Sequence, residues 1–402
     1  MRIGLVVGLT IYVAILSLRN TAAATSTDKV TSIAVLPLKN LCKDTEIEWL
    51  GYGFAESVST KLSNVSSIQI VERSRLSDAL KELKLQASGL VDPAKAGKLG
   101  KLVGAQYVIL GSFQKIGESL KADARVVSVE TSVSNKGVEV SGALKDVFNI
   151  ESDLALKLME ALGKTPTENE SVSIAKPETS SITAYEWKVK GVQAMQKDND
   201  PAKAISCFDK AIDLKTDYAD AYCDRGIAYY SKGDFDKAMA DYAKAISFDP
   251  KHYITYYNRA AVYFAQNEYD MAMADYDKAI DLNPNFAPSY NGRGMIYLEK
   301  EDYDRAIAEY DKAIKLDPTY AFAYCNRGNA YDEKDDLKHA LQDYNKSISL
   351  KPNVAGTYYD RGMAYLNNKM YTQAKSDLDK AISLDPNGPT GAEAKKLLEE
   401  IP

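Results

Sequence analysis

Aromatic and small residues alternate with polar ones in a pattern that repeats every 34 residues over the second half of the chain. The same interval separates the members of three sets: Pro250, Pro284, Pro318, Pro352 and Pro386; Tyr222, Tyr256, Tyr290, Tyr324 and Tyr358; Arg225, Arg259, Arg293, Arg327 and Arg361. Inside one period, Gly226 follows Tyr222 by four residues and Tyr229 follows by three more, which is helical spacing. A proline after a second amphipathic run ends each period. Each period therefore predicts a helical hairpin, and small residues such as Gly226 allow its two helices to approach closely.

This pattern resembles the tetratricopeptide (TPR) repeat, in which aromatic, Gly, Tyr, Ala and Pro positions recur over 34 residues. The resemblance covers residues 184–386 and counts six repeats, the first beginning at Tyr185 or Trp187. Residues 388–402 resemble the charged capping helix that an open stack of hairpins needs for solubility. The resemblance implies an all-α solenoid of helix-turn-helix repeats that binds other proteins or peptides.

Residues that recur in every repeat are expected to form the core of the stack, so selectivity should come from variable positions on its concave side. In the TPR family those positions lie on the first helix of each repeat. They imply a partner-binding groove made of Tyr230, Tyr257, Phe264, Asn291, Phe322, Asn329 and Tyr359. The set lacks the matched Lys, Arg and Asn side chains of TPR domains that hold a carboxy-terminal carboxylate. It suits an extended or helical apolar segment, and an undefined protein surface is an equal alternative.

The region 29–163 predicts a separate α/β domain. Strand-like runs lie at 31–40 and 66–73, and three more follow between residues 105 and 149, joined by short turns. Amphipathic helical runs separate the first strands, and another, beginning at Ile150, ends the region. Residues 164–183 are rich in Thr, Ser, Glu and Pro, a composition that predicts a flexible linker. The fold class is therefore an α/β domain followed by an all-α solenoid.

The order of these runs resembles a bacterial cell-envelope family that includes the TolB amino-terminal domain, the curli secretion protein CsgG and FlgO-like domains. The resemblance rests on IAVLPLKNL, EWLGYGFAESVSTKL and the run from VERSRL to ILGS. It implies an envelope protein whose domain serves assembly or interaction. The strands after residue 106 have short turns and lack the long apolar hairpins of a membrane pore, so pore formation is not inherited from the resemblance.

The first 24 residues predict an export signal. Arg2 precedes an apolar run over 3–18, and Ala22 and Ala24 form a small-residue cleavage pattern. The run is shorter than the ~20 residues of a spanning helix, so a cleaved signal is favoured over a retained anchor. The expected location is the periplasm or cell envelope, with no stable transmembrane segment in the mature form.

The composition offers little catalytic chemistry. The chain carries a net charge of −6 without a basic cluster, which argues against nucleic-acid binding. It has two histidines, His252 and His339, which are expected to be solvated surface residues because metal sites need several converging ligands. Gly97, Gly100 and Gly104 are expected to pack and cap a helix. We therefore expect no enzyme, no catalytic residue, no metal and no cofactor.

Two functions fit these patterns. The first is an exported envelope scaffold or adaptor that binds partner proteins through the TPR array and docks to an envelope assembly through the α/β domain. The alternative is a self-assembling component of an envelope secretion or assembly complex, in which the α/β domain forms the oligomer.

Overall fold

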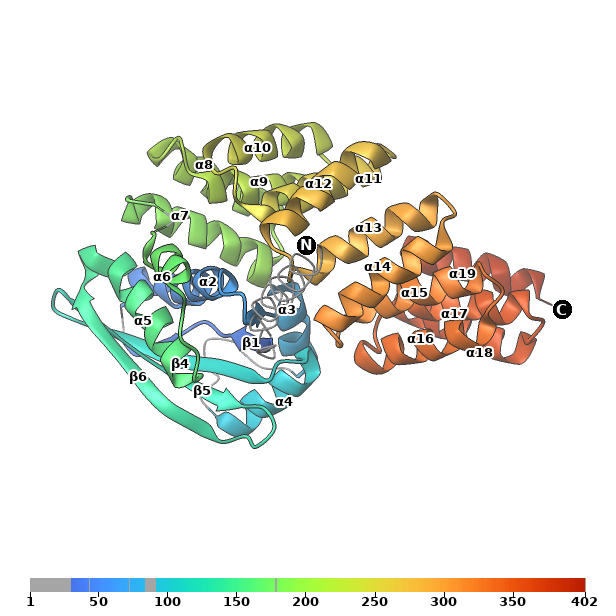
Figure 1. The fold of residues 1–402 in the computed structure, drawn as a ribbon, viewed down its shortest axis with the longest axis horizontal. Helices are drawn as coiled ribbons and strands as arrows, with labels where there is room; N and C mark the ends of the chain where they lie inside the picture. The colour runs from blue at the N-terminus through green and yellow to red at the C-terminus, as the bar shows by residue number, and fades with distance from the viewer. Residues whose placement is uncertain (1–29, 43, 72, 84–91, 178, 402) are drawn as a thin grey trace, which may run out of the picture.

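The computed structural model describes residues 30–42, 44–71, 73–83, 92–177 and 179–401. The predicted export signal over 1–24 lies outside the described residues. An α/β layer structure forms the first part of the chain, and a curved array of helical hairpins extends away from it toward the C-terminus (Figure 1).

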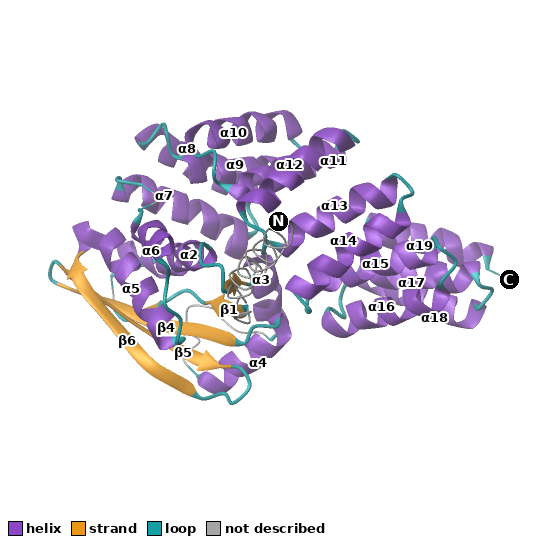
Figure 2. Cartoon of the chain, viewed as in Figure 1, coloured by secondary structure: helices purple, strands orange, loops and turns teal. Residues whose placement is uncertain are grey.

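The strands of the α/β domain form one mixed sheet (Figure 2). Its strands are β1 Thr31–Val35, β2 Lys39–Asn40, β3 Ile68–Ile70, β4 Tyr107–Ile116, β5 Ser119–Ser128 and β6 Ser134–Ala143. They lie in the order β3-β1-β4-β5-β6, with β2 pairing β4 separately. The β3-β1-β4 pairs are parallel, whereas β4-β5-β6 is an antiparallel meander. The terminal strands β3 and β6 therefore leave the two edges of the sheet.

Helices cover both faces of this sheet. They are α2 Trp49–Ser63, α3 Arg73–Glu82, α4 Pro93–Val103 and α5 Val147–Ala161, with short 3-10 turns at Thr45–Ile47 and Leu144–Asp146. Along β4, Ile109 and Phe113 pack with Phe54 of α2, while Val108 packs with Leu99 of α4 on the other face. This alternation follows from the two-residue period of a strand buried on both sides.

The glycines of α4 pack and cap that helix, as expected. Gly104 ends it in the left-handed region at φ 69°. A Cβ on Gly100 would lie 2.3 Å from Val129 and 2.9 Å from Val108, so no larger residue fits against the sheet there.

The prediction of a flexible linker over 164–183 is wrong, because residues Glu168–Ala175 form helix α6. Thr167 and Glu170 form a reciprocal capping box at its start, a Thr-x-x-Glu signal that composition alone obscures. Ile174 is fully buried in the α/β core, and Lys61 of α2 donates to its carbonyl over 2.7 Å. A few specific contacts thus order a segment that is too polar to fold alone.

The remaining helices pair into hairpins. The pairs are α7 Ile182–Gln193 with α8 Pro201–Leu214, α9 Ala219–Ser231 with α10 Phe235–Phe248, α11 Tyr253–Ala265 with α12 Tyr269–Leu282, α13 Ala287–Glu299 with α14 Tyr303–Leu316, α15 Ala321–Asp332 with α16 Leu337–Leu350, and α17 Ala355–Asn367 with α18 Tyr371–Leu384. A π-helical turn, η4 Ala194–Asp198, interrupts the first hairpin, and α19 Pro389–Glu400 packs on α18 at the end of the stack.

The small residue of each period has the predicted role. A Cβ on Gly226 would lie 2.5 Å from the ring of Tyr242, and one on Gly328 would lie 2.8 Å from Tyr344. The second helix places an aromatic ring directly against the first helix, so only a residue without a side chain gives the full contact.

The recurring arginines join neighbouring hairpins. Arg327 contacts Asp343 through two nitrogens, each over 2.7 Å, and also pairs with Asp311 of the preceding hairpin. Its guanidinium lies over the rings of Tyr324 and Tyr331, at 5.6 and 6.0 Å. Equivalent forks join Arg225 to Asp241, Arg259 to Asp275, Arg293 to Glu309 and Arg361 to Asp377. The period of the arginines is therefore an ion-pair ladder within the stack.

Candidate protein-binding surface

The first hairpin of the array is built into the core of the α/β domain. Tyr185 of α7 is fully buried, and its hydroxyl donates to the carbonyl of Gly53 over 2.7 Å and to Glu151 over 2.9 Å. Its ring packs edge-on against Trp49 and Phe148, at 5.8 and 5.3 Å. The repeat pattern predicts Tyr185 in the core of the stack, but it belongs to the hydrophobic core shared by α2 and α5.

A buried ion pair accompanies this contact. Lys188 of α7 pairs with Glu56 of α2, and the two side chains are 3% and 5% exposed. The carboxylate of Asp224 on α9 lies 3.6 Å from the same ammonium group. Because charges of this kind are stable in a protein interior only when they are paired, the junction has one defined geometry.

Tyr185 and Lys188 occupy inner-face positions of the first repeat. One residue is inserted in the turn of that repeat, so its first helix aligns 35 residues before the next one. On this alignment Lys188 corresponds to Cys223, and Tyr185 corresponds to Phe322 three repeats further on. The inner face of the first repeat is therefore already occupied by a helix, α2. A lysine at a position where the other repeats have no basic residue was the sequence signal for this contact.

A second contact joins the α/β domain to loops between later hairpins. Arg75 of α3 pairs with Asp317 and donates to the Thr319 hydroxyl over 2.7 Å and to the Val103 carbonyl over 2.8 Å. The array thus contacts the domain both at its first helix and at the loop before α15. Sequence periodicity carried no signal for this contact, because it joins residues more than 240 positions apart.

The predicted groove residues differ in exposure. Tyr230 and Phe322 are the most accessible, with 38% and 42% of their surfaces exposed. Tyr230 contacts Phe235 ring to ring at 5.5 Å, and Phe264 contacts Tyr269 at 5.6 Å. Tyr257 is half-buried between the rings of neighbouring residues rather than projecting freely.

Three predicted groove residues are used within the stack. Asn291 is 6% exposed and accepts a hydrogen bond from Asn326 over 2.9 Å, which removes it from the candidate surface. Adjacent first helices pack closely at this position, so a polar side chain is buried there and needs a partner. Asn329 accepts a hydrogen bond from the Tyr344 hydroxyl over 2.7 Å. Tyr359 is half-buried, and burial followed by the charge of Glu393 on the capping helix raises its pKa.

The last repeats carry acidic groups near these residues. Burial raises the pKa of Asp360, which accepts hydrogen bonds from Cys325 over 3.2 Å and from Asn329 over 3.4 Å. Burial and then the charge of Glu333 raise the pKa of Asp332. This end of the inner face is therefore acidic, and it disfavours an acidic ligand.

His252 is not the solvated residue expected from its turn. Its imidazole contacts the Thr255 hydroxyl at 2.7 Å and Asp220 at 3.3 Å, and its side chain is 19% exposed. Burial lowers the pKa of His252, but a hydrogen bond with Cys223 and the charges of Asp220 and Asp249 outweigh burial and raise the pKa to about 9. The tertiary fold brings these groups together around the turn.

The described part of the chain contains no cluster of three or more His, Cys, Asp or Glu side chains that could hold a metal ion. Within the same residues, none of the helices combines the length and the apolar character needed to cross a bilayer. The four cysteines are free thiols.

Comparisons with known proteins match the two parts separately. The family described as curli production assembly/transport component CsgG matches residues 13–143. Tetratricopeptide repeat models match 219–252, 253–286, 321–354 and 355–387, and related TPR models match 199–233, 275–308 and 294–335.

Individual proteins are only distantly similar. A putative adenylate cyclase 3 of Rhizobium meliloti (strain 1021) is 23% identical over 168 residues, which are 42% of this chain and 27% of that protein. The chain thus spans about a quarter of this curated relative. Among solved structures, the APC/C hetero-tetramer Cut9-Hcn1 superimposes with a TM-score of 0.52 at 17% identity, covering 64% of this chain and 53% of that one. The Pseudomonas aeruginosa pilF structure has a TM-score of 0.45 at 16% identity, covering 54% and 97%.

The Cut9-Hcn1 likeness shows the solenoid fold, which is a protein-binding fold in its family. The chain therefore joins a CsgG domain at its amino-terminal side to an array of tetratricopeptide repeats.

Proposed function

We propose that this protein is an exported envelope scaffold or adaptor, located in the periplasm or cell envelope. Its TPR array holds a helical segment of a partner protein, and its CsgG domain docks that partner to an envelope assembly. The apolar run over 3–18 and the CsgG match support the location. Its role is binding rather than catalysis.

One observation carries the proposal. The inner face of the first repeat already binds a helix of the same chain, through Tyr185 and Lys188 on α7. The same face continues over the later repeats, where Tyr230 and Phe322 remain exposed. A surface that packs against α2 at one end has the geometry to pack against another amphipathic helix further along.

Site-specific crosslinking in cells tests this proposal. A photoreactive phenylalanine analogue replaces Phe322 on the inner face in one variant of the full chain and Met271 on α12 in a matched control. Met271 is 52% exposed, so both positions are accessible. We expect specific envelope proteins to be crosslinked from position 322 and not from position 271. Identical products from the two positions, or products only from the cytoplasm, would refute the proposal.

A second function is favoured by the free edge of β6, a ten-residue strand that ends the sheet. Long unpaired edges can pair with another chain. This supports a self-assembling envelope component, and light scattering of the full chain separates it from the first proposal. A monomer at all concentrations counts against self-assembly, whereas a discrete oligomer supports it.

A further inference from the structure

The opposite edge of the sheet faces a pocket between the α/β domain and the array. In the part of the chain that the structure describes, β3 pairs only with β1. The Ser67 carbonyl and the Val71 amide bond to β1, each over 2.9 Å. Main-chain groups alternate in direction along a strand, so the amide of Ile70 and the carbonyl of Ile68 point away from the sheet.

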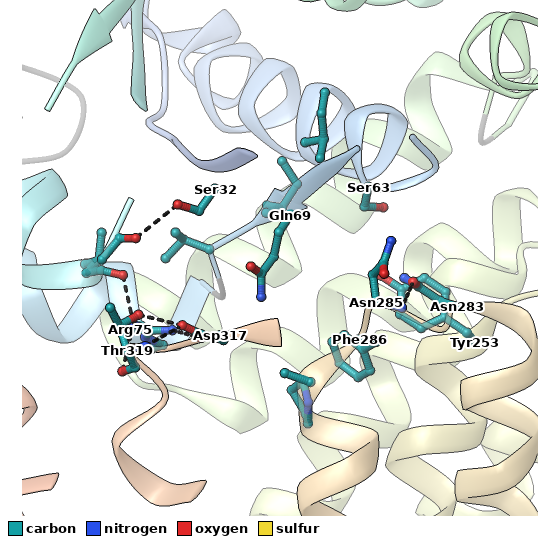
Figure 3. A pocket seen from close by; sticks show the side chains of 17 residues that line it. Ser32, Ser63, Gln69, Arg75, Tyr253, Asn283, Asn285, Phe286, Asp317 and Thr319 are labelled. Atoms are coloured by element: carbon teal, nitrogen blue, oxygen red, sulfur yellow. Dashed lines mark hydrogen bonds and ion pairs between the residues drawn. The ribbon is translucent and has the colours of Figure 1, made fainter. Parts of the chain in front are cut away.

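The pocket lies along this outward edge. Figure 3 shows the side chain of Gln69 between the Arg75–Asp317 contact on one side and Phe286 on the other. Phe286 and Pro288, at the start of α13, give the far wall an apolar character. The space not filled by atoms is about 610 Å³, including volume open to solvent. That volume is within the range of about 300–1,000 Å³ typical of ligand sites.

Two interdomain contacts bound the pocket and hold its walls apart. At one end, Asn285 donates to the Ser66 carbonyl over 2.8 Å. At the other end, Arg75 pairs with Asp317. The pocket is thus continuous with the interface between the domain and the array, and its two charged groups neutralise each other. An uncharged ligand is favoured, because a charged one would compete with that ion pair.

We propose that this pocket binds an extended, uncharged peptide segment of a partner protein, which adds as a strand to the β3 edge. The peptide main chain pairs with Ile68 and Ile70, and an apolar side chain of the peptide packs on Phe286. The occupant must be extended, because only an extended chain presents donors and acceptors at the spacing of a strand edge. This is a second site, distinct from the inner-face surface of the proposed function.

The test compares two substitutions at one residue in the full chain. Ile70→Pro removes the outward amide and places a ring on the edge, whereas Ile70→Val keeps the amide. Proline is tolerated on a strand edge because the lost donor is not part of the ladder. Random dodecapeptides displayed on phage are selected on the wild-type protein, and the recovered peptides are synthesised with a fluorescent label for anisotropy titrations.

We expect peptides whose affinity falls at least about tenfold with Ile70→Pro and less than about twofold with Ile70→Val. Phe286→Ala should weaken them too. Should Ile70→Pro fail to fold, hydrogen exchange of wild-type segment 66–71 provides the measurement, since a bound strand must slow it. Recovery of no peptide, equal binding to both Ile70 variants, or unchanged exchange would overturn the proposal. Crosslinking from position 322 is unaffected in each case, so failure here is distinguishable from failure of the scaffold proposal.

Discussion

Removing the ammonium group of Lys188 tests whether the array is fixed to the α/β domain. In Lys188→Met, the carboxylate of Glu56 stays in an interior where only 5% of its side chain is exposed. Solvent screens such a site poorly, so the loss should follow the behaviour of buried rather than surface pairs. Removing one partner of a buried pair costs about 3–5 kcal/mol. This is a large share of the roughly 5–15 kcal/mol that stabilises a typical domain.

The assay is urea unfolding of the full chain, followed by circular dichroism and by tryptophan fluorescence, which Trp49 at the junction should dominate. Lys190→Met is the matched control, because Lys190 lies on the same helix in a pair with Glu186 whose side chains are 33% and 27% exposed. Its removal should cost about 0.3–0.5 kcal/mol. The double variant Lys188→Met with Glu56→Gln should recover more than half of the loss, since no buried charge remains unpaired.

A flexible tether predicts a different result. If residues 164–183 let the array move freely, Lys188 and Glu56 would be solvated apart, and both lysine variants would lose less than about 1 kcal/mol. Equal, small losses for the two variants would therefore refute the fixed junction. A double variant that is as unstable as Lys188→Met would refute the assignment of the loss to an unpaired carboxylate.

Three further predictions concern the array. Gly226→Ala should destabilise it by about 1–3 kcal/mol because the added Cβ meets a ring at 2.5 Å, whereas Gly356→Ala, with nothing within 4 Å, should be neutral or stabilising by up to ~1 kcal/mol; thermal unfolding compares them, and equal effects contradict the packing argument. Because the folded pKa of His252 is raised to about 9 by Cys223 and Asp220 against the desolvation that lowers it, its contribution of about 2–3 kcal/mol is complete below pH 6.5 and is lost as the pH rises through 9. Unfolding measured from pH 6 to 10 should show a decline that His252→Gln removes, and an unchanged decline contradicts it. Arg327→Ala should cost about 1.5–3 kcal/mol in the same unfolding assay, because the acceptors of its fork lose a charged donor; a loss below about 0.5 kcal/mol would show that the ladder does not hold the hairpins together.

The 34-residue period is sufficient to predict the helical hairpins and the role of their small residues. Periodicity is a local property: the contact between Gly226 and Tyr242 spans one hairpin and recurs in every repeat. The same reasoning recognised the strands of the α/β domain, since β4 and β5 are joined by a two-residue turn and pair directly. The recurrence of the arginines is visible in the sequence, but their acidic partners are evident only from the fold.

Contacts between distant parts of the chain needed the tertiary structure. Composition predicts a flexible 164–183, yet one buried isoleucine and one lysine bonded to its carbonyl hold α6 on the domain. The burial of Asn291 and the occupied inner face at Lys188 depend on which helix lies opposite, and no local pattern records that neighbour. The sequence by itself therefore determined the elements and the stack, because these depend on near neighbours along the chain. The tertiary structure alone decided which surfaces stay free for a partner, because exposure is a property of the whole fold.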